Sequence, residues 1–293
     1  MLRLRRRARS EGARLHFGFR SIRWERGDHV VIFPNYEPYL ISMCMDKLAL
    51  LLSRAVPTLS GKTKIVDFRG PSIPFRTPSG QQVWLPGLIE LNDTCAGYLA
   101  RGAPGPGDIV LDAGAFCGEL TIELALLVGP SGRVFAMEPD PANLEMLRRN
   151  LAFHRLENVT LLPHALWAST TDLVFNAHAH CGSSVQGLQG SADGSDRTRT
   201  ITVSALSPAD LFALIGRVPD FIKMDIEGAE VEAVSALAPL LADATHPVRL
   251  AIASYHLREG RPTHKLITPV LVAAGLQVET GNPEHITTWA LKP

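Results

Sequence analysis

The sequence predicts an α/β fold in which a mainly parallel sheet carries helices on both faces. The main observation is an alternation of short apolar segments with segments of helical period after residue 108, which is typical of βαβ units. A second observation is that acidic residues come at the ends of apolar segments: Asp112, Glu138 and Asp225. These ends are expected at one edge of the sheet. The predicted strands are 109–112, 133–137, 159–162, 221–225 and 249–253. The predicted helices between them lie near 118–128, 141–153 and 229–241.

The first predicted strand ends in an unusual turn, within VLDAGAFCGEL (110–120). The apolar run stops at Asp112, and Gly114 and Gly118 follow before the helical pattern begins. Glycine permits a positive φ and close approach to the backbone. A helix that begins here directs free N–H groups and a positive dipole end toward the turn. These features predict a ligand-binding loop, in which we include Ala115 and Phe116.

The second predicted strand ends in VFAMEPD and leads into a well-defined helix start. Asp140 is a good N-cap, and Pro141 suits the first helical position. Glu138 ends the strand at the place where doubly wound folds hold two ribose hydroxyls with a carboxylate. The two motifs together predict a nucleoside-type cofactor.

The character of the first loop indicates which cofactor this is. DAGAFCG lacks the GxGxxG pattern that binds a pyrophosphate, which disfavours an NAD(P)-dependent oxidoreductase. Asp112 would repel a phosphate but suits a cation, such as the amino group and sulfonium of S-adenosylmethionine. We therefore expect S-adenosylmethionine. A catalytically inactive cofactor-binding or scaffold protein remains an alternative.

The fourth predicted strand carries a dense group of charges in FIKMDIEGAE (221–230). Period two places Lys223 and Asp225 on the same side of the strand. Gly228 releases the chain into a helix whose first acid, Glu230, is interpreted as a helix-start residue. Asp225 is expected at the same sheet edge as Asp112 and Glu138, so we assign it a functional role, in both the cofactor site and the catalytic site.

Two later segments depart from the simple alternation. Residues 163–205 are polar, rich in Gly and Ser, and lack helical period, which is typical of a functional lid or binding loop. Near the end, a helix around 263–274 precedes LQVETG and HITTWALK, which are joined by Gly281-Asn-Pro. This pattern predicts an antiparallel hairpin that closes the sheet.

The Gly- and Pro-rich segment 101–107 separates an N-terminal region from the predicted α/β domain. We expect residues 1–27 to be a basic, flexible tail, and 28–100 to be an α+β extension. In that extension, 39–56 predicts a packed helix, and 64–70 and 81–87 predict short strands. Residues 101–293 are expected to form the main domain, with 163–205 as an insertion.

Composition excludes several classes of protein. Lys and Arg together number 29, as do Asp and Glu, so no net field favours binding to nucleic acid. The most apolar window contains charged residues, so no membrane span is expected. The four cysteines show no CxxC pair or metal spacing. They are typical of free thiols in a reducing cytoplasm, which is the expected location.

Four segments occur in an order and spacing that resemble the FkbM-type methyltransferases. They are VLDAGAFCGELTIELA, RVFAMEPDPANLEMLRRNL, NVTLLPHALWAS and IKMDIEGAEVEAVSAL. The resemblance implies a Rossmann-like, seven-stranded fold and O-methyl transfer from S-adenosylmethionine to a small-molecule acceptor, a sugar or natural-product hydroxyl. It places Asp112, Gly114, Gly118 and Glu138 in the cofactor site, and we add Ala165 from the third segment. Where the family often has Glu, this chain has Ser254.

A hydroxyl acceptor must lose a proton, so the reaction calls for a base or an orienting group. Asp225 and His256 each follow an apolar strand of the same predicted sheet, and we expect them to meet at the reacting centre. His178 and His180 form an HxH pair in the insertion without a convincing third ligand, so no metal site is expected.

Overall fold

The structure is a computed structural model of the chain. It describes residues 2–10, 12–34, 48–86, 94–177, 182–188, 199–282 and 285–293. The chain divides into two compact units, Met1–Leu91 and Asn92–Pro293. Among the described residues, no helix is both long enough and apolar enough to cross a membrane.

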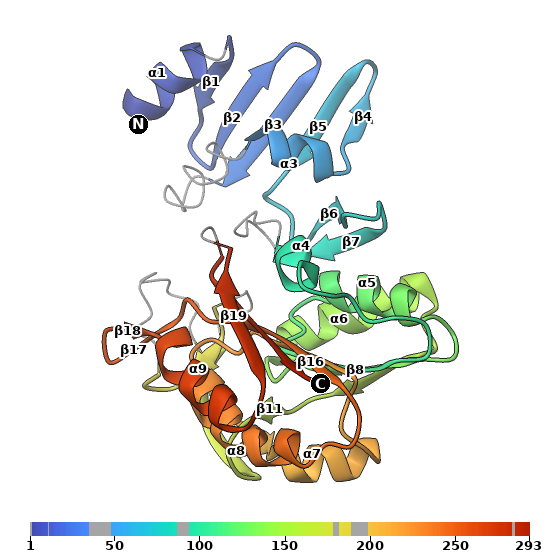
Figure 1. Ribbon diagram of the computed structural model, residues 1–293. Helices are drawn as coiled ribbons and strands as arrows, with labels where there is room; N and C mark the ends of the chain where they lie inside the picture. The colour runs from blue at the N-terminus through green and yellow to red at the C-terminus, as the bar shows by residue number, and fades with distance from the viewer. Residues whose placement is uncertain are drawn as a thin grey trace. The chain divides into compact units, whose positions relative to one another are not determined.

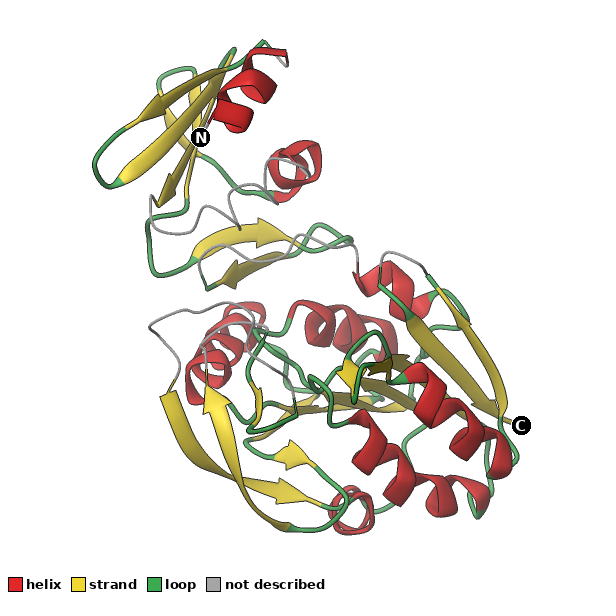
Figure 2. Ribbon diagram, turned by 90° about the vertical axis from the view of Figure 1, so that its left-hand side faces the viewer, coloured by secondary structure: helices red, strands yellow, loops and turns green. Residues whose placement is uncertain are grey.

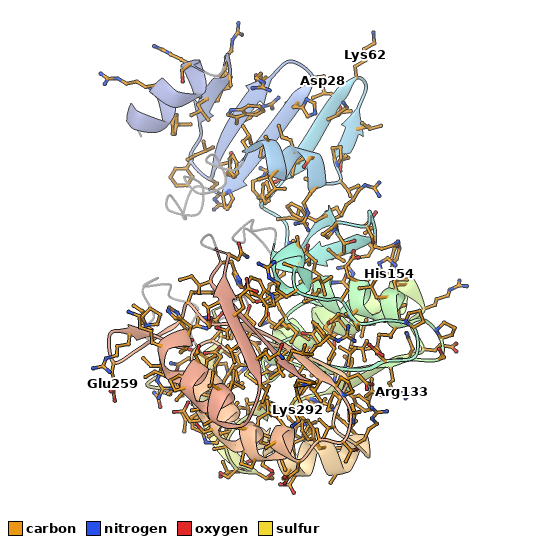
Figure 3. The ribbon with its side chains drawn as sticks, viewed as in Figure 1. Asp28, Lys62, Arg133, His154, Glu259 and Lys292 are labelled. Atoms are coloured by element: carbon orange, nitrogen blue, oxygen red, sulfur yellow. The ribbon has the colours of Figure 1, made fainter. Side chains whose placement is uncertain are left out.

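The N-terminal unit is built on a five-stranded sheet in the order β1-β2-β3-β5-β4 (Figure 1). A hairpin, β6–β7, follows it in the sequence. Trp24, Phe33 and Phe75 are fully buried and form part of the core of the N-terminal unit. Asp28 and Lys62 lie at the turns β2–β3 and β4–β5, at one end of the sheet (Figure 3). The elements are α1 (Leu2–Ser10), β1 (Arg14–Phe17), β2 (Ser21–Arg26), β3 (His29–Pro34), α3 (Leu48–Arg54), β4 (Thr58–Ser60), β5 (Thr63–Asp67), β6 (Ile73–Arg76) and β7 (Gln82–Leu85).

This unit differs from our expectation of a flexible tail over residues 1–27. Residues 14–17 and 21–26 are strands of the sheet, because Ile22 and Trp24 alternate with polar residues and bury their side chains. The short strands expected in 64–70 and 81–87 are present as β5 and β7. Of the helix expected in 39–56, the structure describes residues 48–56 and places α3 there; 39–47 lie outside the described residues.

The C-terminal unit contains a seven-stranded sheet in the order β10-β9-β8-β15-β16-β20-β19. All neighbours are parallel except β20, which is antiparallel to both β16 and β19. The predicted doubly wound sheet with a closing antiparallel hairpin is thus confirmed. The strands are β8 (Ile109–Ala113), β9 (Arg133–Met137), β10 (Val159–Leu162), β15 (Phe221–Met224), β16 (Val248–Ala253), β19 (Gln277–Gly281) and β20 (Thr287–Lys292).

Helices cover both faces of this sheet (Figure 2). The two neighbours Val110 and Leu111 point to opposite faces, so each belongs to a different core. One core packs α4 and α5 against the sheet, and the other packs α7, α8 and α9. The helices are α4 (Thr94–Leu99), α5 (Glu119–Val128), α6 (Pro141–His154), α7 (Pro208–Ile215), α8 (Glu230–Ala242) and α9 (His264–Ala273).

The described part of the insertion forms a sheet of its own. Its four strands are β11 (Ala165–Leu166), β12 (Thr171–Ala177), β13 (Ser184–Val185) and β14 (Arg199–Leu206), in the order β11-β14-β12-β13. Phe175, Val203 and Ala205 are buried between its strands. Period-two alternation in β12 and β14 supports this small core. One further hairpin, β17 (Leu257–Arg258) with β18 (Arg261–Pro262), follows β16, and Glu259 at its turn points outward (Figure 3).

Candidate functional site

The glycines of the β8–α5 loop are required by contacts within the protein. Gly114 has a φ of 77°, and a Cβ atom there would lie 1.8 Å from the carbonyl oxygen of Asp225. Gly118 has a φ of 89°, and its Cβ would lie 2.4 Å from Leu147 Cδ1 of α6. We expected a ligand to approach this backbone. The structure shows that the turn after β15 and helix α6 approach it. The two glycines have no Cβ atom and so allow the loop to pack closely against these neighbours.

Asp112 points into the protein from the end of β8. Its carboxylate is fully buried, accepts a hydrogen bond from Thr121 Oγ1 at 2.6 Å, and lies 3.0 Å from Lys223 Nζ. The Lys223 ammonium also donates to the carbonyl oxygen of Gly114 at 2.5 Å. We expected Asp112 to face the cation of the cofactor. The structure instead pairs it with Lys223, since a buried carboxylate needs a compensating charge.

Glu138 follows β9 and holds the loop backbone from the other side. Its carboxylate accepts hydrogen bonds from Phe116 N–H at 2.8 Å and from Asp140 N–H at 2.9 Å. Phe116 has a φ of 52°, so a non-glycine residue adopts the left-handed conformation at this contact. Burial raises the pKa of Glu138 to about 8, although the two N–H donors oppose this shift.

The residues at this edge fit a nucleoside cofactor. Glu138 is a buried carboxylate whose oxygens are already oriented by backbone amides, and a carboxylate accepts hydrogen bonds from ribose hydroxyls. It follows β9, the strand next to β8, and the strand order reverses between β8 and β15, which is the usual position of ligands in such sheets. The predicted N-cap is also confirmed, since Asp140 accepts a hydrogen bond from Ala142 N–H at 2.8 Å.

The insertion contacts this same turn. Ser183 Oγ donates a hydrogen bond to Asp140 Oδ2 at 2.7 Å, and the neighbouring Ser184 is 2% exposed. Ser183 therefore joins the insertion to the segment that follows Glu138. The sequence offered no signal for this contact, because a serine in a polar segment is usually a surface residue.

Asp225 and His256 are close together, as predicted. Asp225 Oδ1 lies 3.7 Å from His256 Nε2, and the side chain of His256 is only 1% exposed. Two further acids complete the cluster: Glu227 Oε2 is 3.5 Å from Nε2, and Glu230 Oε1 is 3.0 Å from Nδ1. Three carboxylates therefore surround one imidazole.

This environment changes the chemistry expected of His256. Burial by itself lowers the pKa of His256, but the charges of Glu230 and Glu227 outweigh it and hold the pKa well above its ordinary value. We expected an imidazole that titrates near neutrality and takes a proton from the acceptor. A raised pKa favours the protonated imidazole when no other cation is bound, which makes His256 a poor base for the hydroxyl proton.

Glu230 also differs from its interpretation as a helix-start acid. It is fully buried, and its Oε1 accepts hydrogen bonds from Ile226 N–H at 3.1 Å and Gly228 N–H at 3.3 Å. The carboxylate thus holds the turn that carries Glu227, whose own φ is 54°.

Two residues of the site had no signal in the sequence. Tyr98, in α4, is buried and donates a hydrogen bond from its hydroxyl to Asp225 Oδ2 at 2.7 Å. His285 lies 3.4 Å from the same hydroxyl through Nε2 and contacts the ring of Tyr255. Tyr98 and Asp225 are 127 residues apart, so no local spacing relates them.

The structure also locates the other residues that the sequence analysis named. Ala165 begins β11 and is packed in the core of the insertion sheet, and Ala115 is 5% exposed within the loop. Ser254 is buried and shares a hydrogen bond of 2.8 Å with Thr288. His178 and His180 lie outside the described residues. Of the four cysteines, Cys95 and Cys117 are buried free thiols, and Cys44 and Cys181 lie outside the described residues.

Comparison with known proteins finds methyltransferases. A protein-L-isoaspartate O-methyltransferase of Methanothrix thermoacetophila is 45% identical over 53 residues, which are 18% of this chain and 25% of that protein. A probable cobalt-precorrin-6B C(15)-methyltransferase (decarboxylating) of Saccharolobus solfataricus is 42% identical over 57 residues, 19% of this chain and 29% of that protein. The chain thus spans about a quarter of the length of the curated relatives it matches.

Among solved structures, the crystal structure of methyltransferase FkbM from Methylobacillus flagellatus is 20% identical. The match covers 68% of this chain and 47% of that one, with a TM-score of 0.49. A family model described as the methyltransferase FkbM domain matches residues 112–267, which is more than half of the 293 residues. The matched region contains the β8–α5 loop, Glu138, Asp225 and His256. The chain therefore belongs to the FkbM methyltransferase family, and its cofactor is S-adenosylmethionine.

Proposed function

We propose that the protein transfers a methyl group from S-adenosylmethionine to a hydroxyl oxygen of a small molecule, a sugar or a natural product. The observation that carries the proposal is the oriented carboxylate of Asp225. Its Oδ2 accepts a hydrogen bond from the hydroxyl of Tyr98, while its buried Oδ1 has no hydrogen-bond partner among the described residues. An acceptor hydroxyl can donate to Oδ1, and the carboxylate would take its proton as the oxygen–methyl bond forms and the methyl–sulfur bond of the cofactor breaks.

The cofactor supplies an electrophilic methyl group, and the chain supplies alignment. We assign the holding of the ribose to Glu138, with the β8–α5 loop, Gly114 to Gly118, beneath the cofactor. Asp112 supports this loop through Lys223. Asp225 orients the acceptor hydroxyl, and His256 fixes the carboxylates around it. Asp225 follows β15 and Glu138 follows β9, so both lie at the carboxyl edge of the sheet.

The insertion is the proposed acceptor-binding segment. Its described residues reach the N-cap of α6 through Ser183, next to the proposed ribose site. Loops at the carboxyl edge of an open α/β sheet commonly determine which ligand binds.

The test is transfer of a labelled methyl group from S-adenosylmethionine into pools of sugars and small hydroxylated metabolites, with each product identified by mass and by NMR. We expect methyl ethers as products, and loss of transfer in Asp225→Asn at unchanged cofactor affinity. Two outcomes would contradict the proposal. Label on carbon, nitrogen or a protein carboxyl would exclude O-methylation of a hydroxyl, and tight cofactor binding without any transfer would favour the non-catalytic alternative.

A further inference from the structure

The cluster around His256 carries more negative charge than its neighbours neutralise. Asp225, Glu227 and Glu230 all lie within 3.7 Å of the imidazole ring. The nearest basic side chains are already paired: Lys223 contacts Asp112, and Arg258 contacts Glu232 through two hydrogen bonds. A buried excess of carboxylates is costly unless a cation compensates it.

The contacts of His256 have the spacing of metal ligands and lack the alignment of hydrogen bonds. Nε2 has no hydrogen-bond partner among the described residues, although the ring is buried. Nε2 lies 3.7 Å from Asp225 Oδ1 and 3.5 Å from Glu227 Oε2. Two ligand atoms each about 2.1 Å from one ion in tetrahedral geometry are about 3.4 Å apart. Each of the two oxygens therefore lies at a distance from Nε2 that a shared ion allows.

Buried carboxylate oxygens without hydrogen-bond partners lie on both sides of the imidazole ring. Asp225 Oδ1 and Glu230 Oε2 have no hydrogen-bond partner within the described residues, and Glu230 is fully buried. One ligand atom from each of Asp225, Glu230 and His256 lies within 4.8 Å of the other two. Oxygens in this state are suited to a cation.

The cluster also has the outer contacts that metal sites need. Tyr98 donates to Asp225 Oδ2 and so turns Oδ1 toward the ring. Glu230 lies 3.0 Å from Nδ1, on the side of the imidazole opposite Nε2. A carboxylate behind a ligating imidazole sets its tautomer and orientation in many metal sites. Glu230 also holds the turn with Glu227 through Ile226 N–H and Gly228 N–H.

We propose that Asp225, Glu227 and His256 Nε2 bind one divalent transition-metal ion, Mn²⁺ or Zn²⁺, with Glu230 positioning the imidazole from behind. One imidazole and two carboxylates favour these ions over Ca²⁺, which takes oxygen ligands only. The side chains of Asp225 and Glu227 are 23% and 17% exposed, so the site is open on their side. An oxygen ligand can enter there; that this ligand is the acceptor hydroxyl rests on the proposed function.

Binding of the metal alone tests the proposal. The full chain, first dialysed against a chelator, is titrated with Mn²⁺ by calorimetry and by the loss of the free-ion EPR signal, and then with Zn²⁺ and Ca²⁺. We expect one Mn²⁺ or Zn²⁺ per chain, and at least 10-fold weaker binding of Ca²⁺. His256→Ala and Glu227→Gln should each weaken binding by at least 100-fold. Glu230→Gln, which changes only the outer contact, should weaken it by roughly 10–100-fold.

Glu232→Gln is the matched control, because this carboxylate lies in the same first turn of α8 but contacts Arg258. It should bind the metal like the wild-type chain. Circular dichroism checks that each variant folds. If His256→Ala does not fold, the metal affinity of Glu227→Gln tests the site instead. Absence of binding to the wild-type chain, or equal binding by the folded ligand variants, would overturn the site.

The outcome is separable from that of the proposed function. If metal binds and no hydroxyl is methylated, the ion site stands and the proposed function fails. If methyl ethers form and the chain binds neither Mn²⁺ nor Zn²⁺, the proposed function stands and the cluster is a structural ion pair between α8 and the end of β16.

Discussion

Lys223 Nζ lies 3.0 Å from Asp112 Oδ1, and both side chains are almost completely buried, at 5% and 0% exposure. The pair joins the ends of β8 and β15, the two central strands of the sheet, where Asp112 and Lys223 are also direct partners in the parallel register. The same ammonium donates to the carbonyl oxygen of Gly114, so one side chain holds both strand and loop.

Breaking this pair from one side should destabilise the protein strongly. Lys223→Met leaves a buried carboxylate without its partner, which costs about 3–5 kcal/mol of the free energy of unfolding. Urea denaturation measures this cost. Asp112→Asn combined with Lys223→Met should be less destabilised than the sum of the two single variants, because the uncompensated charge is then absent. If the losses in the free energy of unfolding were additive, the interaction between Asp112 and Lys223 would not contribute to stability.

The glycines of the loop allow a second prediction. Gly114→Ala should not fold to the native state, because its φ is positive and the new Cβ would meet a backbone oxygen of Asp225. Gly118→Ala should be milder, since it meets the end of the Leu147 side chain, which can move. Thermal unfolding of the purified variants would rank them. Gly129→Ala is the control for strain alone, as its φ is 65° and nothing lies within 4 Å of the Cβ position.

Cofactor affinity should depend on Glu138. Glu138→Ala removes the carboxylate that is proposed to accept the ribose hydroxyls and should weaken binding of S-adenosylmethionine by about 2–4 kcal/mol. Calorimetry measures this loss, with Glu145→Ala as control, because Glu145 is an exposed residue of α6. Wild-type affinity in a folded Glu138→Ala variant would remove the ribose assignment.

Glu138 should also make stability depend on pH in the cofactor-free protein. Its pKa is raised from 4.5 to about 8 by burial, so between these pH values the unfolded chain is ionised there and the folded chain is protonated. The folded state then binds more protons, and this contribution to the free energy of unfolding falls as pH rises from about 4.5 to about 8. Above pH 8 it no longer changes.

Urea denaturation of wild-type protein and Glu138→Gln at pH 5.5 and 8.5 measures this dependence. The amide does not titrate, so the stability advantage of the wild-type chain over the variant should shrink by a few kcal/mol at the higher pH. A constant difference between the two proteins would show that burial does not disfavour the ionised carboxylate.

The insertion should affect the acceptor more than the cofactor. A chain shortened within residues 189–196 keeps β12, β13 and β14, together with the Ser183–Asp140 contact. We expect methyl transfer to fall by at least 10-fold while the affinity for S-adenosylmethionine stays within about 2-fold. On one preparation, calorimetry measures the affinity for S-adenosylmethionine and the labelled-methyl assay measures methyl transfer. A parallel loss of cofactor affinity would place the insertion in the cofactor site.

The sequence by itself determined the elements of the C-terminal unit, because their signals are local. Short apolar runs located β8, β9 and β10, and Asp140 with Pro141 located the start of α6 to the residue. The parallel sheet follows from helices between successive strands, and its edge gathers Glu138 and Asp225 by connectivity alone.

Tertiary structure decided what the charged residues face. Spacing in FIKMDIEGAE predicted that Lys223 and Asp225 share a side, but the register of β15 against β8 decided that Lys223 neutralises Asp112. Likewise, the strands of the insertion form a core only once β12 pairs with β14, which follows it later in the chain. The acids around His256 come from the single segment 225–230 and meet a histidine that follows β16, and Tyr98 reaches Asp225 from α4. Such contacts depend on distances through space between groups far apart in the chain, and these distances set the burial and charge that decide each group's chemistry.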